Sequence, residues 1–227
     1  MVENDSEKRE KRRQLFLNWN IEKELPEKIG EYRLGRTDVQ DHGIYRAFAY
    51  TEKTCGWSVQ AIFDEETMDY MVKTDLSLFT LTDIDMITGD FLSFQKSVDE
   101  LLPGHIQKEL IDRDKVSVLV RGHAFTMWNY QSVYPESICG FTRVIDPSAP
   151  VLGLNGSYVI AAYESREDKS GILFFYNMYR NEYYGEMRKN GVPIIIHQYD
   201  ARSTEELENA VRKHMKEDLM QLGRKDS

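Results

Sequence analysis

The stretch that decides the fold is residues 203–223, which read STEELENAVRKHMKEDLMQLG. Ser203 is followed three residues later by Glu206, which is the spacing of a capping box at a helix start. Apolar residues then recur every three or four positions, so one stripe of the helix must be buried. Gly223 predicts a left-handed stop. The stripe consists of Leu207, Val211, His214 or Met215, Leu219 and Leu222.

The residues before this helix predict the strands on which it packs. Asn190-Gly191 is the strongest short hairpin signal in the chain and joins strands expected at 183–189 and 192–199. Pro193 has no amide hydrogen, which places its strand at a sheet edge or at a bulge. Residues 172–179 are almost continuously apolar, as in a central strand that is covered on both faces.

The first half of the chain follows the same order of strands and then a helix. A helix is expected from Phe91, and Pro103-Gly104 is expected to break it before 106–111 resume it. We therefore predict an α+β fold of mostly antiparallel twisted sheets backed by helices, with two similar β-then-α halves as an open alternative. Strands are predicted at 31–34, 44–50, 56–63, 70–73, 76–81, 116–120, 124–128 and 157–163.

Three segments describe the predicted domain organisation. Residues 1–24 form a frayed N-terminal helical arm, of which 14–24 dock as a short helix. Residues 25–113 form the first α+β half and 114–227 the second, packed with the first as one unit. Each half contains a Cys-Gly-aromatic triplet, at 55–57 and 139–141, which is a further sign of two related halves.

Composition limits the classes of function. The 227 residues include 38 acidic and 29 basic residues, for a formal charge of −9, which disfavours a nucleic-acid binder or an anionic membrane surface. No apolar run approaches the roughly 20 residues of a membrane span, and no secretory signal is recognisable. Cys55 and Cys139 are expected to be reduced, and the expected location is the cytoplasm.

Three aspartates precede the helix that is predicted from Phe91, and they are candidate metal ligands. Asp83, Asp85 and Asp90 match neither a calcium loop nor the Asp-x-Asp-x-Thr motif of phosphatases, because Ile87 and Thr88 fall at the wrong positions. We interpret them as a strand-to-helix turn in which Asp83, Thr88 or Asp90 caps the helix. No cofactor is expected.

A cysteine and a histidine are the alternative catalytic pair, for a hydrolase or an acyltransferase. His42-Gly-Ile-Tyr45 resembles the His-x-Gly-Ile-Tyr run of permuted papain-like acyltransferases and hydrolases, although His42 directly adjoins Gly43. The other interpretation is two buried, inert cysteines beside glycines. The candidate catalytic residues are Cys139, Cys55, His42, His123 and His197.

Aromatic residues supply the remaining candidate, a binding surface. Two segments, 128–134 and 174–185, concentrate the Tyr, Trp, Met and Arg side chains that anchor protein interfaces and stack on sugar rings. We predict a non-catalytic protein-interaction module of an inhibitor or immunity-like type, and we expect its partner to be a basic protein. A carbohydrate or small-ligand binder is the alternative. The predicted binding residues are Trp128, Tyr130, Tyr134, Tyr179, Tyr183 and Tyr184.

Overall fold

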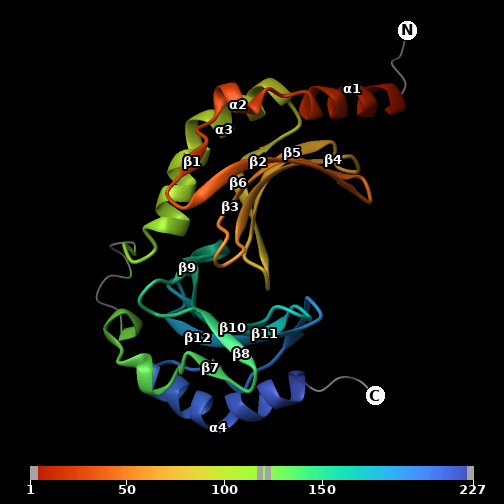
Figure 1. Ribbon diagram of the computed structural model, residues 1–227. Coiled ribbons are helices and arrows are strands. Elements are labelled where there is room, and N and C mark those ends of the chain that lie inside the picture. Colours follow the sequence, from red (N-terminus) through yellow and green to blue (C-terminus); the bar gives the residue numbers. More distant parts are fainter. Residues whose placement is uncertain (1–4, 117–119, 121–123, 224–227) are drawn as a thin grey trace. The chain divides into compact units, whose positions relative to one another are not determined.

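The chain divides into two compact units, Met1–Ile111 and Asp112–Ser227, in a computed structural model (Figure 1). The structure describes residues 5–116, 120 and 124–223. Each unit contains one antiparallel sheet and a long helix after its last strand, so the predicted α+β class is confirmed.

The first unit is a six-stranded meander in the order β1-β2-β3-β4-β5-β6. Neighbours along the chain are neighbours in the sheet, as expected where short turns join antiparallel strands. Helices α1 (Asp5–Leu17) and α2 (Ile21–Glu24) precede the sheet, and α3 (Phe91–His105) with the π-helix η1 (Ile106–Ile111) follows it. The strands are β1 (Lys28–Ile29), β2 (Tyr32–Asp41), β3 (Ile44–Thr51), β4 (Ser58–Asp64), β5 (Asp69–Asp75) and β6 (Thr80–Thr88).

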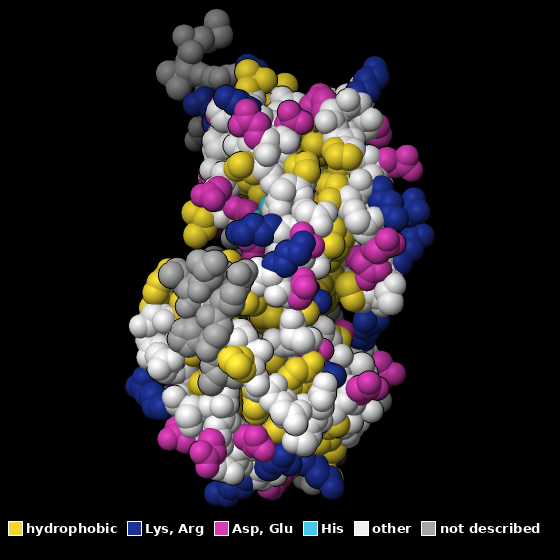
Figure 2. Space-filling model, turned by 90° about the vertical axis from the view of Figure 1, so that its left-hand side faces the viewer, with side chains coloured by type: hydrophobic (Ala, Val, Ile, Leu, Met, Phe, Trp, Pro, Cys, Tyr) yellow, Lys and Arg dark blue, Asp and Glu magenta, His cyan; other side chains and the backbone are white. Residues whose placement is uncertain are grey.

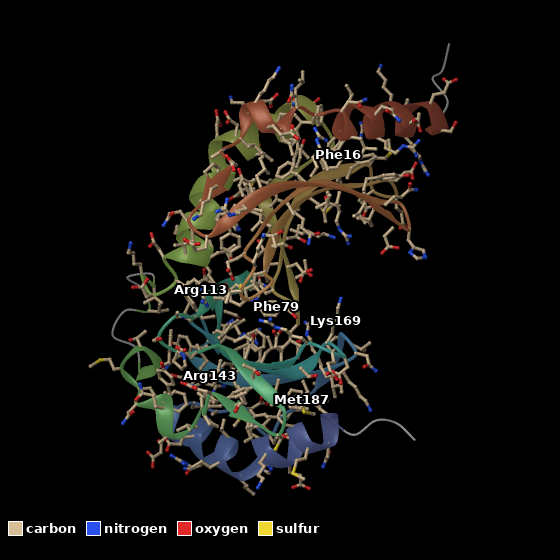
Figure 3. The ribbon with its side chains drawn as sticks, in the orientation of Figure 1. Phe16, Phe79, Arg113, Arg143, Lys169 and Met187 are labelled. Atoms are coloured by element: carbon tan, nitrogen blue, oxygen red, sulfur yellow. The ribbon has the colours of Figure 1, made fainter. Side chains whose placement is uncertain are left out.

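Helix α1 is fastened to the first sheet. The Phe16 ring is buried between α1 and the sheet (Figure 3), where it contacts the rings of Phe63 and Tyr70. The Arg12 guanidinium donates to the Met68 carbonyl at 2.8 Å, and the Tyr70 hydroxyl donates to the Arg12 carbonyl at 3.0 Å. The helix therefore begins at Asp5, well before the segment that was expected to dock.

The second unit orders its sheet β13-β12-β11-β10-β8-β7, with β9 paired to β10. Helix α4 (Thr204–Leu222) lies along one face of this sheet (Figure 1). Short 3₁₀ helices occur at η2 (Ala124–Met127), η3 (Tyr130–Ser132) and η4 (Leu154–Gly156). The strands are β7 (Ser137–Ile138), β8 (Phe141–Ile145), β9 (Val151–Leu152), β10 (Ser157–Ser165), β11 (Ser170–Asn177), β12 (Glu182–Lys189) and β13 (Val192–Ile195).

Helix α4 agrees with its sequence pattern except at its two ends. The Ser203 hydroxyl accepts from the Glu206 amide at 3.1 Å, and the Glu206 carboxylate accepts from the Arg202 amide, one residue earlier than predicted. Gly223 is right-handed at φ −75°, so the predicted left-handed stop is wrong. The buried stripe is confirmed as Leu207, Val211, Met215, Leu219 and Leu222.

The two units share details as well as the order of their elements. The Tyr50 hydroxyl donates to the Pro26 carbonyl at 2.6 Å, and the Tyr163 hydroxyl donates to the Pro135 carbonyl at 2.7 Å. The two Cys-Gly-aromatic triplets are not equivalent, because 55–57 follow β3 whereas 139–141 join β7 to β8. Buried residues recur every four positions in Phe94, Val98 and Leu102 of α3 and Ile106 of η1, as they do in Leu207, Val211, Met215 and Leu219 of α4.

Several local predictions are corrected. Helix α3 passes through Pro103 without a break, because its stripe of buried residues continues from Val98 to Ile106 across the proline. Residues 82–88 are part of β6 rather than a turn. Residues Ala124–Met127 form a 3₁₀ helix rather than the predicted strand, and none of the described strands pairs with them. Of the strand predicted at 116–120, residues 117–119 lie outside the described residues.

Candidate functional site

The hairpin that joins β11 to β12 is held by hydrogen bonds from one side chain. The Asn177 Oδ1 atom accepts from the backbone amides of Tyr179 and Arg180, both at 3.0 Å. Asn181 is left-handed at φ 50°, a conformation that asparagine tolerates, and its Oδ1 atom accepts from the Tyr176 hydroxyl. The tip therefore has one defined backbone conformation.

Tyr179 is exposed, and its ring contacts Gly156. Its side chain is 74% exposed, yet one edge of its ring lies against Gly156. A Cβ atom at Gly156 would lie 2.4 Å from Tyr179 Cε2, and the Met178 amide donates to the Gly156 carbonyl at 2.9 Å. Gly156 has φ 69°, a left-handed conformation that favours glycine, so a larger residue would be strained here.

Two arginines near the same hairpin share one carboxylate. Arg180 Nη1 lies 3.4 Å from Glu182 Oε1, and Arg202 Nη1 lies 3.2 Å from Glu182 Oε2. Arg202 Nη1 also donates to the Arg180 carbonyl at 3.2 Å. Both guanidinium groups are largely exposed. We call Tyr179, Arg180, Glu182 and Arg202 the Tyr179 cluster; two cations and one anion leave it with a positive charge.

The other predicted aromatic residues lie in different surroundings. Tyr134 and Tyr183 are buried in the second core, so their side chains do not belong to a surface. Tyr184 points to the opposite sheet face from Tyr183, where it stacks on Phe175 at 4.8 Å and 6° and donates to Ser157.

Trp128 and Tyr130 pack, half-buried, against the second core. The Trp128 indole donates to Glu208 of α4 at 3.2 Å, and the Tyr130 hydroxyl donates to Asp146 at 3.0 Å. Their polar atoms thus bind within the unit. Of the six predicted residues, Tyr179 alone presents most of its side chain to solvent.

The cysteines and histidines are not brought together by any hydrogen bond of the described residues. Burial, together with a hydrogen bond to Glu52, raises the pKa of the Cys55 thiol to about 11, which opposes thiolate formation at neutral pH. Cys139 is exposed, not buried as expected, and its thiol contacts the Lys216 carbonyl at 3.8 Å.

The candidate histidines have local partners. His42 and His197 are exposed and lie beside the carboxylates of Asp41 and Asp200, at 2.5 and 3.1 Å. His123 lies outside the described residues. Cys139 and His42 both occupy the first position of a two-residue turn, with φ 52° and 46°, where each is followed by a left-handed glycine.

Asp83 belongs to a polar group that the sequence did not indicate. His105 Nδ1 lies 2.9 Å from Asp83 Oδ2, and His105 Nε2 lies 3.4 Å from the Thr74 hydroxyl. The hydrogen bond from His105 lowers the pKa of the Asp83 carboxyl. Thr74 is buried, so this series links α3 to β5 and β6 rather than presenting a nucleophile. The His105 side chain is mostly buried.

The three aspartates do not form a metal centre. Asp83 binds His105, Asp85 donates its own amide to the Asp83 carboxylate, and Asp90 caps α3 by accepting from the Ser93 amide. Across the described part of the chain, no group of three or more His, Cys, Asp or Glu side chains is placed to hold a metal ion.

Charge is distributed unevenly along the chain. Residues 1–111 contain 22 acidic and 14 basic residues, whereas 112–227 contain 16 and 15. Figure 2 shows acidic and basic side chains interspersed on the face that it displays. The acidic character expected of the whole chain therefore comes mostly from the first unit, and the Tyr179 cluster lies in the nearly neutral second unit.

Comparison of this chain with protein-family models, with curated proteins and with solved structures found no match. Among the helices of the described residues, none is both long enough and apolar enough to cross a membrane. The functional argument consequently rests on the side chains themselves.

Proposed function

We propose that the protein is a non-catalytic protein-interaction module that contacts its partner through the Tyr179 cluster. The observation that carries this proposal is the exposed Tyr179 ring, which lies against Gly156 on the hairpin that also carries Arg180. Tyrosine and arginine are enriched among the residues that dominate binding energy at protein interfaces.

Preorganisation is the physical reason that favours this site. A side chain that is already fixed loses little conformational freedom on binding, whereas an ordinary flexible side chain costs about 0.5–1.5 kcal/mol to immobilise. Glu182 orients Arg180 and Arg202 through contacts at 3.4 and 3.2 Å before any partner arrives.

The charge of the cluster selects the chemistry of the partner segment. Two guanidinium groups share one carboxylate, so hydrogen-bond donors remain for a partner's Asp or Glu side chains. We therefore expect an acidic segment with an aromatic or apolar residue for Tyr179. A basic partner stays a prediction, and the acidic first unit is the part that would bind it. An inhibitor or immunity-like role also stays a prediction.

The test is quantitative capture of proteins from a lysate of the native host by the immobilised full chain. Proteins bound through the cluster are expected to be retained by the wild type and lost at least tenfold with Tyr179→Ala and with Arg180→Glu, because each variant removes one anchor. Retention should also fall as salt rises.

The matched control is Met127→Ala, which truncates another highly exposed side chain of the same unit. It should retain the same proteins as the wild type. Equal retention by the wild type and Tyr179→Ala would contradict the proposed site, and loss with Tyr179→Ala but not Arg180→Glu would contradict the acidic partner.

A further inference from the structure

We infer that the free edge of β13 pairs with β13 of a second copy of this chain, antiparallel and centred on Ile195. This strand is the last of the second sheet. Its Ile195 side chain is 85% exposed and Val192 63% exposed. An edge strand with exposed apolar side chains is a template for another strand.

The open part of this edge has defined limits. Strand β12 pairs with β13 from Glu186 to Lys189, and its Tyr183 pairs with Ala201 after the chain turns back. The turn is closed by the Asp200 amide, which donates to the His197 carbonyl at 3.1 Å. The edge available to a second copy therefore consists of β13 (Val192–Ile195) and of Ile196 and His197, which follow it before the turn.

The hairpin turn determines which backbone groups point outward. Asn190 and Gly191 have φ of 54° and 79°, the two-residue turn in which the flanking pair, Lys189 and Val192, exchanges hydrogen bonds. Because such pairs alternate, the amide and carbonyl of Ile195, opposite Glu186, point away from β12. Two copies related by a twofold axis at Ile195 would exchange these bonds.

Pro193 does not oppose this register. The pairing places Pro193 of each copy opposite His197 of the other, so that the Pro193 carbonyl accepts from the His197 amide. Pro193 has no amide to donate in return. The His197 carbonyl already accepts from Asp200, so no acceptor loses its partner.

The side chains also match themselves. On one sheet face Ile195 meets Ile195, and on the other Ile194 meets Ile196, so apolar side chains are buried against each other on both faces. This self-matching apolar pattern favours a second copy over an unrelated strand.

The seam is short, so the association should be weak. Stable interfaces bury roughly 1,200–2,000 Å² in total, more than a single strand pair provides. We expect a weak dimer that dissociates on dilution. Sedimentation velocity of the full chain over a series of concentrations measures it directly.

Charge substitutions test the register. Ile195→Lys sets two like charges opposite each other and should raise the dissociation constant at least tenfold, and Ile195→Glu should do the same. An equal mixture of the two variants should regain the wild-type constant. Ile84→Lys, at an isoleucine 69% exposed on the edge strand of the first unit, is the control and should not change it.

A disulfide trap gives an independent readout. In a Cys55→Ser, Cys139→Ser background, Ile195→Cys should form a covalent dimer on mild oxidation, because the Cα atoms of such a pair lie about 5.5 Å apart. Ile84→Cys in the same background should not. Sedimentation as a monomer throughout, equal crosslinking at both positions, or β13 occupied by a strand of another protein would each overturn the inference.

Discussion

Tyr134 and Tyr163 are neighbouring buried tyrosines that differ in one hydrogen bond. The Tyr163 hydroxyl donates to the Pro135 carbonyl at 2.7 Å. The Tyr134 hydroxyl is buried without a partner, among the rings of Tyr163, Phe174 and Trp128. An unpaired buried hydroxyl costs free energy, whereas a paired one contributes about 1 kcal/mol.

Tyr134→Phe is therefore expected to leave the free energy of unfolding unchanged or to raise it by up to about 1 kcal/mol. Tyr163→Phe should lower it by about 1 kcal/mol, because it leaves the Pro135 carbonyl unpaired. Urea unfolding of both variants provides the measurement. An equal loss in the two variants would show that the Tyr134 hydroxyl is paired.

Asp83 links stability to pH. His105 holds the pKa of the folded Asp83 carboxyl below its ordinary value of 3.8. A carboxyl with a lowered pKa stabilises the fold above its unfolded pKa, and this contribution is lost as pH falls through the folded pKa. Asp83→Asn should be less stable than the wild type at pH 6, and the difference should shrink below about pH 4.

The measurement is urea unfolding at several values between pH 3 and pH 7. Asp85→Asn is the matched control, because Asp85 is the exposed neighbour on the same strand and makes no contact with His105. A difference between wild type and Asp83→Asn that stays constant with pH would argue that the pair with His105 does not stabilise the fold.

At the level of elements, α4 depends on its N-terminal cap. Ser203 accepts from the Glu206 amide at 3.1 Å, so Ser203→Ala should lower the free energy of unfolding by about 1 kcal/mol. Asn209→Ala, at an exposed position inside the same helix, should be neutral or slightly stabilising. Thermal unfolding distinguishes them, and equal melting temperatures for the two variants would count against the cap.

Elements with local signals were predictable from the sequence. The Asn190-Gly191 turn and the apolar stripe of α4 are each specified by residues that are close in the sequence, and both were found where expected. The β7–β8 hairpin was missed because two-residue β7 is too short for a periodic pattern. The uninterrupted α3 was missed because proline is a local signal, whereas the packing of its stripe is a property of the tertiary structure.

The candidate site was predictable only in part. Tyr179 belonged to the predicted aromatic surface, and its exposure follows from its place at a hairpin tip. Arg202 was missed because it reaches Glu182 only after the chain returns to pair Ala201 with Tyr183. The burial of Tyr134 and Tyr183 was missed because it depends on the tertiary packing of the second core.

At the scale of the whole molecule, the two units carry the same hairpin tip with different side chains. Asp64 Oδ1 accepts from the amides of Glu66 and Thr67 at 2.9 and 3.3 Å, as Asn177 does in the second unit. Met68 is left-handed at φ 63°, as Asn181 is. The tip is acidic in the first unit and carries Tyr179 and Arg180 in the second.

This equivalence predicts that the tips are interchangeable. Replacing residues 65–68 by the sequence of 178–181 should change the free energy of unfolding by no more than about 1 kcal/mol, because the backbone conformation is shared and asparagine suits the left-handed position. Thermal unfolding measures the effect. The same four residues placed at 52–55, where the turn differs, should cost more; an equal cost would contradict the equivalence.

The shared tip separates what folding demands from what a partner can recognise. The capping residue and the left-handed residue are constrained by the backbone, whereas exposed positions between them, such as Glu66 and Tyr179, are open to substitution. Substitutions there can accumulate in one half while the other half keeps its own set. The chain thus carries two loops on one kind of scaffold, and selection can change the specificity of either without readjusting a core.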